Sequence, residues 1–180
     1  MNISTELVYK AIAHYSGLGY KIIDVPLVVD YDVSAHTKPE GVPDLCHTSG
    51  KVYVASAEQS FIQLHKDGLL PNGKYMALTP CYRAERLLDS THYLMFIKLE
   101  LINVGQECHS VLIDSDDFFK NYVNTYYEGN MYNGVMDIIS NGVELGSYGF
   151  RQMLDGTVYT FGTGIAEPRL SHCISLNGVI

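Results

Sequence analysis

The sequence predicts an α+β fold: a mostly antiparallel sheet that carries the functional site on one face and helices on the other. Between Tyr75 and Glu100, two runs of alternating apolar and polar residues flank a charged loop, the pattern of a β-hairpin with an extended loop. The dipeptide Asn141-Gly142 separates two further alternating runs and predicts a tight hairpin turn. Segments with apolar residues three and four positions apart predict the helices that complete this arrangement.

The N-terminal segment predicts a helix followed by a strand. Apolar residues recur at helical spacing over 4–15, with Asn2 or Ser4 as the cap and glycines beyond the end. Residues 20–29 are rich in β-branched side chains and predict a strand. Its Pro26 cannot donate to a ladder, so we expect an edge strand or an interrupted one.

The middle of the chain alternates loops with short regular elements. Residues 30–50 show little periodicity and predict a loop. A strand is expected over 52–56 and a helix over 57–65, with Ser56 as its cap.

A further helix is predicted over 114–128. Its aromatic and branched side chains share one face and are expected in the core, whereas its charged residues point outward. The inward set is Phe118, Phe119, Tyr122, Val123 and Tyr126, and the outward set is Asp116, Asp117 and Lys120.

Length, charge and cysteine usage narrow the class of protein. We expect one domain over 1–180, which is long enough for a real core. A net charge of −8 and a pI near 5.2 argue against a broad electrostatic footprint for nucleic acid. The four cysteines lie far apart without a Cys-x-x-Cys pair, and no signal peptide or long apolar run occurs. A cytoplasmic protein without disulfides or a membrane span is therefore expected.

The long hairpin brings together side chains suited to a nucleotide. Arg83 and Glu85 share one face of the incoming strand, and Phe96, Lys98 and Glu100 share one face of the return strand. A guanidinium pairs with phosphate, an aromatic ring packs on a base, and a carboxylate accepts from an exocyclic amine. The same arginine could instead pair with Glu85 or Glu100 and have only a structural role.

These residues also carry a family resemblance. The spacing Arg83-Ala84-Glu85, then His92, Phe96 and Glu100, resembles motif 2 of the class II aminoacyl-tRNA synthetases, nearest to the aspartyl and asparaginyl branch. The upstream helix, Gly-Tyr pair and strand with Pro26 are similar to motif 1, which implies a homodimer.

Two downstream segments continue the resemblance. Residues 141–151 resemble the Asn-Gly-x-Glu-Leu-Gly-Gly-Gly-Ser-x-Arg stretch of aspartyl-type enzymes, in which the Glu, here Glu144, contacts the magnesium of ATP. Residues 161–170 are similar to motif 3, whose arginine, here Arg169, binds the γ-phosphate. Their form Gly-x-Gly-Ile-x-x-x-Arg-Leu also resembles ammonia-dependent asparagine synthetase, which activates aspartate without tRNA.

The start of the predicted helix at 57–65 resembles another family element. Ser56-Ala57-Glu58-Gln59 is similar to the Ser-Pro-Gln or Thr-Ala-Glu sequences that hold the α-amino group of the substrate. The plainer interpretation is that Glu58 complements the helix dipole.

The resemblance implies a minimal class II core that uses ATP and Mg²⁺ to activate a small carboxylate, expected to be an amino acid, as its adenylate. Arg83 and Arg169 would hold the α- and γ-phosphates, and Glu144 with Glu100 the magnesium ion. The remaining nucleotide-binding residues implied are Glu85, Arg86, His92, Phe96 and Gly164, and the substrate-binding residues are Glu58, Gln59, Ser147 and Arg151.

Departures from the motifs keep a second hypothesis open. Ala166 replaces the last glycine of motif 3, Thr91 stands where a second arginine is common, although Arg86 could substitute, and Met95 replaces a polar residue. The alternative is a catalytically silent paralogue that binds a nucleotide, a metabolite or a protein. The motifs use most of the 180 residues, so no anticodon-binding domain is expected and tRNA is not supported as a partner by charge or size. The acceptor, whether ammonia, an amine or tRNA, stays open.

Overall fold

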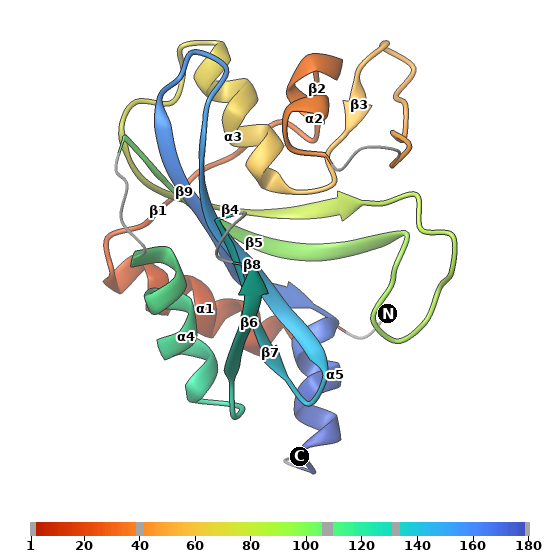
Figure 1. Ribbon diagram of the computed structural model, residues 1–180, viewed down its shortest axis with the longest axis vertical. Coiled ribbons are helices and arrows are strands. Elements are labelled where there is room, and N and C mark those ends of the chain that lie inside the picture. Colours follow the sequence, from red (N-terminus) through yellow and green to blue (C-terminus); the bar gives the residue numbers. More distant parts are fainter. Residues whose placement is uncertain (1–2, 39–41, 106–109, 131–133, 179–180) are drawn as a thin grey trace.

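The computed structural model describes residues 3–38, 42–105, 110–130 and 134–178 (Figure 1). The helices are α1 Thr5–Gly17, α2 Tyr31–Thr37, α3 Ala57–Lys66, α4 Ser110–Lys120 and α5 Arg169–Leu176. The strands are β1 Lys21–Ile22, β2 Val28–Val29, β3 Val52–Tyr53, β4 Gly73–Tyr82, β5 Met95–Val104, β6 Tyr126–Asn130, β7 Val135–Ser140, β8 Val143–Gln152 and β9 Val158–Glu167.

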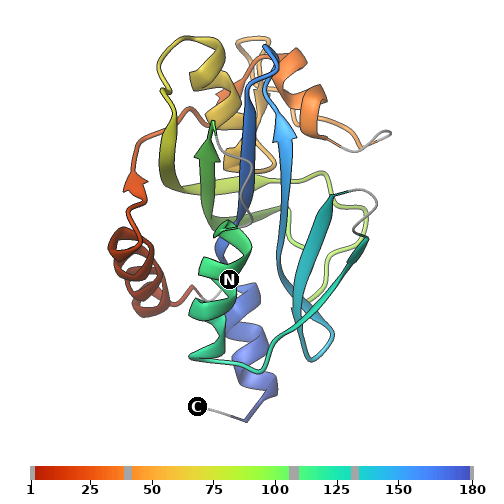
Figure 2. The same cartoon turned by 60° about the vertical axis from the view of Figure 1, so that its left-hand side comes forward.

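The predicted α+β fold with a mostly antiparallel sheet is confirmed. Seven strands form one sheet in the order β1-β4-β5-β9-β8-β7-β6, and only the short β1 pairs in parallel with its neighbour β4. Strands β2 and β3 form a separate two-stranded sheet. Figures 1 and 2 show α2, α3 and the small sheet at one end of the molecule and α1, α4 and α5 at the other.

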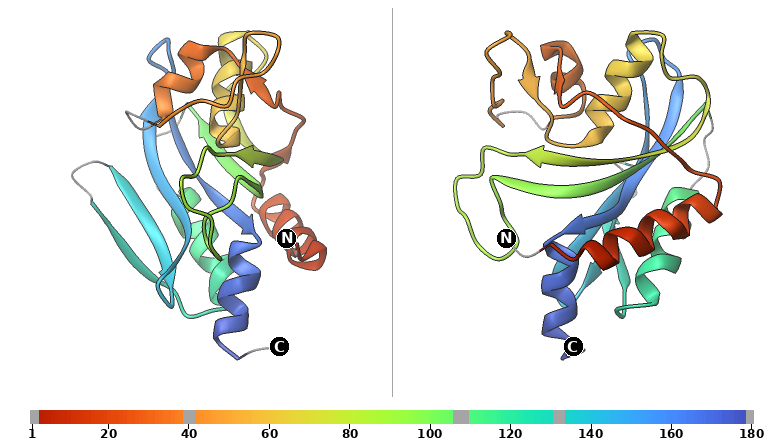
Figure 3. Two further views of the ribbon diagram at one scale, coloured as in Figure 1. Left: turned by 90° about the vertical axis from the view of Figure 1, so that its right-hand side faces the viewer. Right: turned by 180° about the vertical axis from the view of Figure 1, so that it is seen from behind.

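Both predicted hairpins form. Strands β4 and β5 pair from Gly73 opposite Val104 to Tyr82 opposite Met95, and the loop between them projects from the body of the molecule (Figure 3). The turn between β7 and β8 has positive φ at both Asn141 (50°) and Gly142 (74°). This is the conformation that a tight hairpin turn requires.

The sheet has an apolar core on each face. Strands β5 and β9 send Leu99, Leu101 and Ile165 toward α1, α4 and α5, where they meet buried aromatic rings such as Tyr15 and Phe119. A second core, which includes Ile102, Val104, Tyr159, Phe61 and Ile62, lies under α3 and the small sheet. The functional site lies on this second face.

A bulge in β9 changes the sheet beside the site. Glu100 of β5 pairs with Thr163, whereas Leu99 pairs with Ile165, so Gly164 has no partner across the ladder. The carbonyls of Thr163 and Gly164 accept hydrogen bonds from the buried hydroxyls of Tyr148 (2.6 Å) and Tyr15 (2.9 Å). Two tyrosines of the helix-covered core therefore fix this part of the backbone.

The N-terminal predictions are confirmed in part. Ser4 caps α1, accepting from the Leu7 amide at 3.3 Å, while Asn2 lies outside the described residues. The strand expected over 20–29 is interrupted around Pro26, because β1 joins the main sheet and β2 joins the small one.

The loop predicted over 30–50 is wrong where α2 forms. This helix has only seven residues, too few to show a repeating apolar pattern. Tertiary contacts hold it: the Gln63 side chain accepts from the Asp30 amide at 2.9 Å, and Val33 and Ser34 are buried.

The helix predicted over 114–128 is wrong at its end. It stops at Lys120, and Tyr126 belongs to β6, opposite Ile139 of β7, with its ring 48% exposed. The aromatic spacing did continue, but strand pairing with β7 determined the structure of these residues. Asp116, expected to point outward, is buried because the Thr125 hydroxyl and Lys120 both bind it.

The described cysteines, Cys46, Cys81 and Cys173, are free thiols, and Cys108 lies outside the described residues. Within the described ranges, no helix is long and apolar enough to cross a membrane.

Candidate functional site

A cavity of about 380 Å³ opens between the main sheet and the elements α2, β3 and α3. Every predicted site residue except Arg86, His92 and Gly164 lines it. The predicted site residues that line the cavity are Glu58, Gln59, Arg83, Glu85, Phe96, Glu100, Glu144, Ser147, Arg151 and Arg169. Strand β5 is far in sequence from β8, but β9 lies between them in the sheet, so Phe96 and Glu100 come close to Glu144, Ser147 and Arg151.

The outer half of the cavity contains a cation on an aromatic ring. Arg83 follows the end of β4, and its guanidinium carbon lies 5.0 Å from the centroid of the buried Phe96 ring. No ion pair joins Arg83 to Glu85 or Glu100 in the described part of the chain. The purely structural pairing considered from the sequence is therefore not the one observed.

Arg169 lies at the start of α5 and faces the same cavity. Its Nη1 donates to the Glu144 carbonyl and carboxylate, both at 3.2 Å, and its Nη2 donates to the Thr91 carbonyl at 3.4 Å. The Glu144 side chain is about half exposed. The Arg169 side chain is only 17% exposed, so solvent screens this pair from the Glu144 side, where an anion can compete for the guanidinium.

The inner half of the cavity contains a buried ion pair. Glu58, in the first turn of α3, accepts from Arg151 Nη1 with both carboxylate oxygens at 2.9 Å and from the Tyr159 hydroxyl at 2.8 Å. Arg151 also stacks 4.5 Å from the centroid of Phe161. Burial raises the pKa of the Glu58 carboxyl, and the Arg151 charge only partly offsets this shift.

Gln59 connects the elements that roof the cavity. Its Oε1 accepts from the Ala55 amide at 2.8 Å, and its Nε2 donates to the Ser34 carbonyl at 3.3 Å. Since both ends of this buried amide are engaged, Gln59 holds α2 against the start of α3.

Lys98 and Glu100 also line the inner half, on the same face of β5 as Phe96. The Lys98 ammonium is 2.7 Å from Glu100 Oε2, which also accepts from the Ser56 hydroxyl. Both side chains are buried. The period-two alternation of β5 already placed Lys98 on this face, but not among the site residues.

Ser147 belongs to an acidic wall of the cavity. Its hydroxyl donates to Asp137 of β7 at 2.6 Å and lies 3.5 Å from Glu144 Oε1. Burial raises the pKa of the Asp137 carboxyl, and the nearby Glu144 charge adds to the shift.

Three predicted site residues do not line the cavity. Arg86 is exposed in the segment after β4, and the His92 ring lies 2.9 Å from the Asp89 carboxylate in the same segment. At Gly164, a side chain would point toward α1, and its Cβ would lie 2.8 Å from a ring carbon of Tyr15. That glycine makes room for the core.

Sequence reasoning missed other lining residues. Lys38 and Asp44 form an ion pair in the inner half of the cavity, and they come from a region expected to be an irregular loop. Tyr159, the second donor to Glu58, lies 101 residues away along the chain. Only the register of β8 against β9 brings it there, and no local pattern signals it.

The carboxylates of the cavity can be compared with what a magnesium ion needs as ligands. No group of three or more metal-ligating side chains exists among the described residues. Mg²⁺ bound through ATP needs only one or two carboxylates, because phosphates and water complete its shell. The half-exposed Glu144 fits this requirement, whereas Glu100 fits poorly because the Lys98 ammonium already lies beside it.

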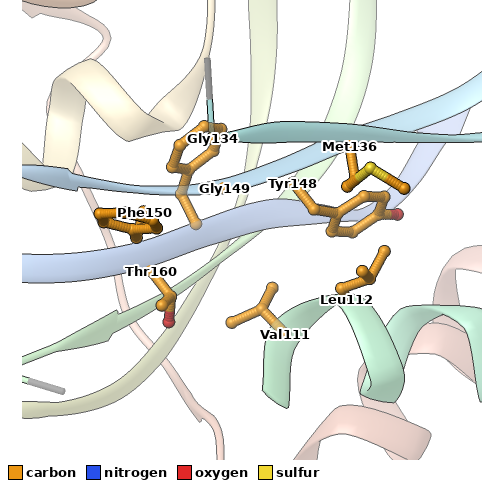
Figure 4. Close-up of a pocket in the computed structure, with 9 residues that line it drawn as sticks. Val111, Leu112, Gly134, Met136, Tyr148, Gly149, Phe150 and Thr160 are labelled. Atoms are coloured by element: carbon orange, nitrogen blue, oxygen red, sulfur yellow. The ribbon is translucent and has the colours of Figure 1, made fainter. Parts of the chain in front are cut away.

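A second, smaller cavity lies on the opposite side of the sheet, between α4 and β7–β9 (Figure 4). Its volume is about 70 Å³, and its lining is apolar apart from the hydroxyls of Tyr148 and Thr160. None of its described lining residues carries a charge that could neutralise a phosphate, so it is not a candidate for nucleotide binding.

Comparison with known proteins yields a structural relationship only. No protein-family model and no curated protein sequence matches the chain. Solved structures that resemble it include Desulfitobacterium hafniense PylSc, a pyrrolysyl tRNA synthetase, at 17% identity, and pyrrolysyl-tRNA synthetase from Desulfitobacterium hafniense at 15%. Each has a TM-score of 0.70 and covers 96% of this chain and 68% of its own. The chain therefore has the catalytic fold of a class II aminoacyl-tRNA synthetase.

Proposed function

We propose that the protein binds ATP with Mg²⁺ and activates a small carboxylate, an amino acid, as its adenylate. One observation carries the proposal: a single cavity in a class II synthetase-like fold is lined by Arg83, Phe96, Glu144 and Arg169. Two arginines can neutralise phosphates, and the ring offers a stacking surface for a base.

Each residue has a distinct role in this proposal. Arg83 binds the α-phosphate, Phe96 and Glu85 bind the adenine, and Arg169 exchanges its pairing with Glu144 for the γ-phosphate. A carboxylate oxygen of the substrate attacks the α-phosphorus, the bond to the bridging oxygen breaks, and pyrophosphate leaves. Charge neutralisation and alignment, rather than proton transfer, lower the barrier of this displacement.

The released Glu144 carboxylate would hold the magnesium ion, which supplies further neutralisation of phosphate charge. Glu58 and Arg151, with Gln59 and Ser147, form the wall against which the amino acid lies. Because Glu58 is already bonded to Arg151 and Tyr159, its main effect is to orient Arg151.

The proposal includes a homodimer. Helix α1 and strand β1 expose Tyr9 (74%) and Ile22 (54%), so this edge of the main sheet presents apolar surface that a second copy would cover. Sedimentation velocity at about tens of micromolar should show a dimer, and a monomer at that concentration would contradict this part of the proposal.

The discriminating assay is amino-acid-dependent exchange of pyrophosphate into ATP. Wild-type protein should catalyse exchange with at least one of the standard amino acids, and the Arg169→Ala variant should lose it. The absence of exchange with every amino acid, combined with ATP binding, would favour the silent paralogue. The ion pair of Arg169 with Glu144, which occupies the arginine that the γ-phosphate would need, is the observation that favours this alternative.

A further inference from the structure

The carboxylates that line the inner half of the cavity differ in how completely the protein satisfies them. Both oxygens of Asp44 accept hydrogen bonds, one of them from the Lys38 ammonium. Both oxygens of Glu58 accept from Arg151, and one also accepts from Tyr159. Neither carboxylate needs a ligand.

Glu100 is different. Its Oε2 accepts from the Ser56 hydroxyl and from the Lys98 ammonium, at 2.7 Å for the latter. Its Oε1 is buried and has no hydrogen-bond partner in the described part of the protein, although the side chain lines the cavity and is only 1% exposed. A buried anionic oxygen without a donor carries a large desolvation cost. The inner half of the cavity therefore lacks one donor.

The inner cations show the complementary pattern. Lys38, Lys98 and Arg151 each pair with a carboxylate of the protein. Among the described lining residues of this half, no cation is left over for an additional carboxylate brought by a ligand, whereas one acceptor oxygen is left over for a donor.

We propose that the substrate presents a nitrogen donor, a protonated amine or an amide NH₂, to Oε1 of Glu100. This inference rests on the proposed function and names the substrate class of the same site. A zwitterionic amino acid adds no net charge to the matched pairs. Dicarboxylates such as aspartate are poor substrates, because their second carboxylate has no free cation and meets a like charge. Glu100 is thus a specificity-determining residue rather than a magnesium ligand.

The nitrogen could be the α-amino group or a side-chain nitrogen, and analogues of the best exchange substrate separate these sources. One analogue replaces the α-amino group by a hydroxyl, and a second, where the substrate has a side-chain nitrogen, replaces it by a methyl. Wild-type protein should lose tenfold or more in kcat/KM with the analogue that lacks the recognised nitrogen. The Glu100→Gln variant should have a kcat/KM about tenfold below that of the wild type with the parent substrate. When the analogue without the recognised nitrogen replaces the parent substrate, the kcat/KM of this variant should fall much less than that of the wild type. The proposal would be overturned if, for every analogue, the loss in kcat/KM caused by the analogue were the same in Glu100→Gln as in the wild type.

Calorimetry separates this proposal from the proposed function. Glu100→Gln should bind ATP with magnesium as the wild type does, and the exposed Glu128→Gln, outside the cavity, serves as the matched control. A tenfold loss of ATP–magnesium affinity in Glu100→Gln alone would assign Glu100 to the metal and overturn the inference.

If no amino acid supports exchange, the proposed function fails, and direct titration with the same amino acids still tests Glu100. Binding to the wild type that weakens about tenfold in Glu100→Gln supports the inference. No binding by any of these compounds overturns it.

Discussion

On the face of the main sheet covered by α1, α4 and α5, the buried core consists of apolar and aromatic side chains, and the hydroxyls of Tyr15 and Tyr148 donate to backbone carbonyls. On the opposite face, the cavity buries Glu58, Lys98 and Glu100. Apolar burial stabilises a fold directly, whereas buried ion pairs roughly offset their own desolvation. The first face should therefore serve stability alone, whereas the second, which has its own apolar core under α3, also carries the ligand recognition.

The largest expected effect is on the helix-covered face. Phe119→Ala removes a fully buried ring of α4 and should lower the free energy of unfolding by about 3 to 5 kcal/mol. Urea denaturation measures this loss. Phe150→Ala, which truncates a ring that is 52% exposed, is the control and should cost about 1 kcal/mol or less. Equal losses would contradict the conclusion that burial on this face stabilises the fold.

A smaller loss is expected from crowding the same face. In Gly162→Ala the added methyl would lie 2.2 Å from Cδ1 of Tyr148 and 2.8 Å from Cγ1 of Val111. Relieving this overlap should cost about 1 to 3 kcal/mol of unfolding free energy. Gly17→Ala in α1, where nothing lies within 4 Å of the new methyl, should be neutral or slightly stabilising by the same measurement.

Substitutions on the cavity face should change affinity more than stability. Arg83→Ala and Arg169→Ala should each weaken ATP–magnesium binding by about tenfold or more, roughly 1.4 kcal/mol, in titration calorimetry. Their melting temperatures should stay near that of the wild type, since Arg83 forms no ion pair among the described residues and the pair of Arg169 with the half-exposed Glu144 contributes only about 0 to 1 kcal/mol.

Arg86→Ala is the matched control for these two variants. It removes an exposed arginine that does not line the cavity, and it should change ATP affinity by less than about threefold because solvent and salt screen its charge. Wild-type affinity in both cavity variants would make their arginines structural.

The smallest expected effect concerns Glu167, a buried carboxylate that has hydroxyl and amide donors from Ser171. Burial raises its pKa above the ordinary 4.5. Its contribution to stability is therefore present below about pH 4.5 and is lost as pH rises through the raised pKa. Relative to Glu167→Gln, the wild type should lose stability with rising pH in this window in urea titrations. If the difference in unfolding free energy between the wild type and Glu167→Gln did not change with pH, the pKa of Glu167 would not be raised by burial.

Local sequence determined the parts of the fold that local interactions control. Asn141-Gly142 adopts the positive φ angles that its turn requires, and Ser4 and Ser56 cap their helices. The alternation in β5 correctly placed Phe96 and Glu100 on one face. These features follow from backbone sterics and from side-chain periodicity, which act over a few residues.

Elements whose structure depends on distant partners were not predictable in the same way. Helix α2 forms where no pattern predicts it, because its contacts with α3 stabilise it. Tyr126 continues a helical spacing but lies in β6, because pairing with β7 satisfies its backbone groups.

The sequence by itself determined which chemical groups are available and the order of the segments that carry them. Only the tertiary structure decided how those groups pair. The union of Glu58 with Arg151 and Tyr159 spans 93 and 101 residues of sequence, and the unpartnered oxygen of Glu100 exists because Ser56 and Lys98 both bind the other one. Hydrogen bonds are satisfied or left open according to three-dimensional proximity, which depends on the register of strands and their bulges rather than on any local pattern.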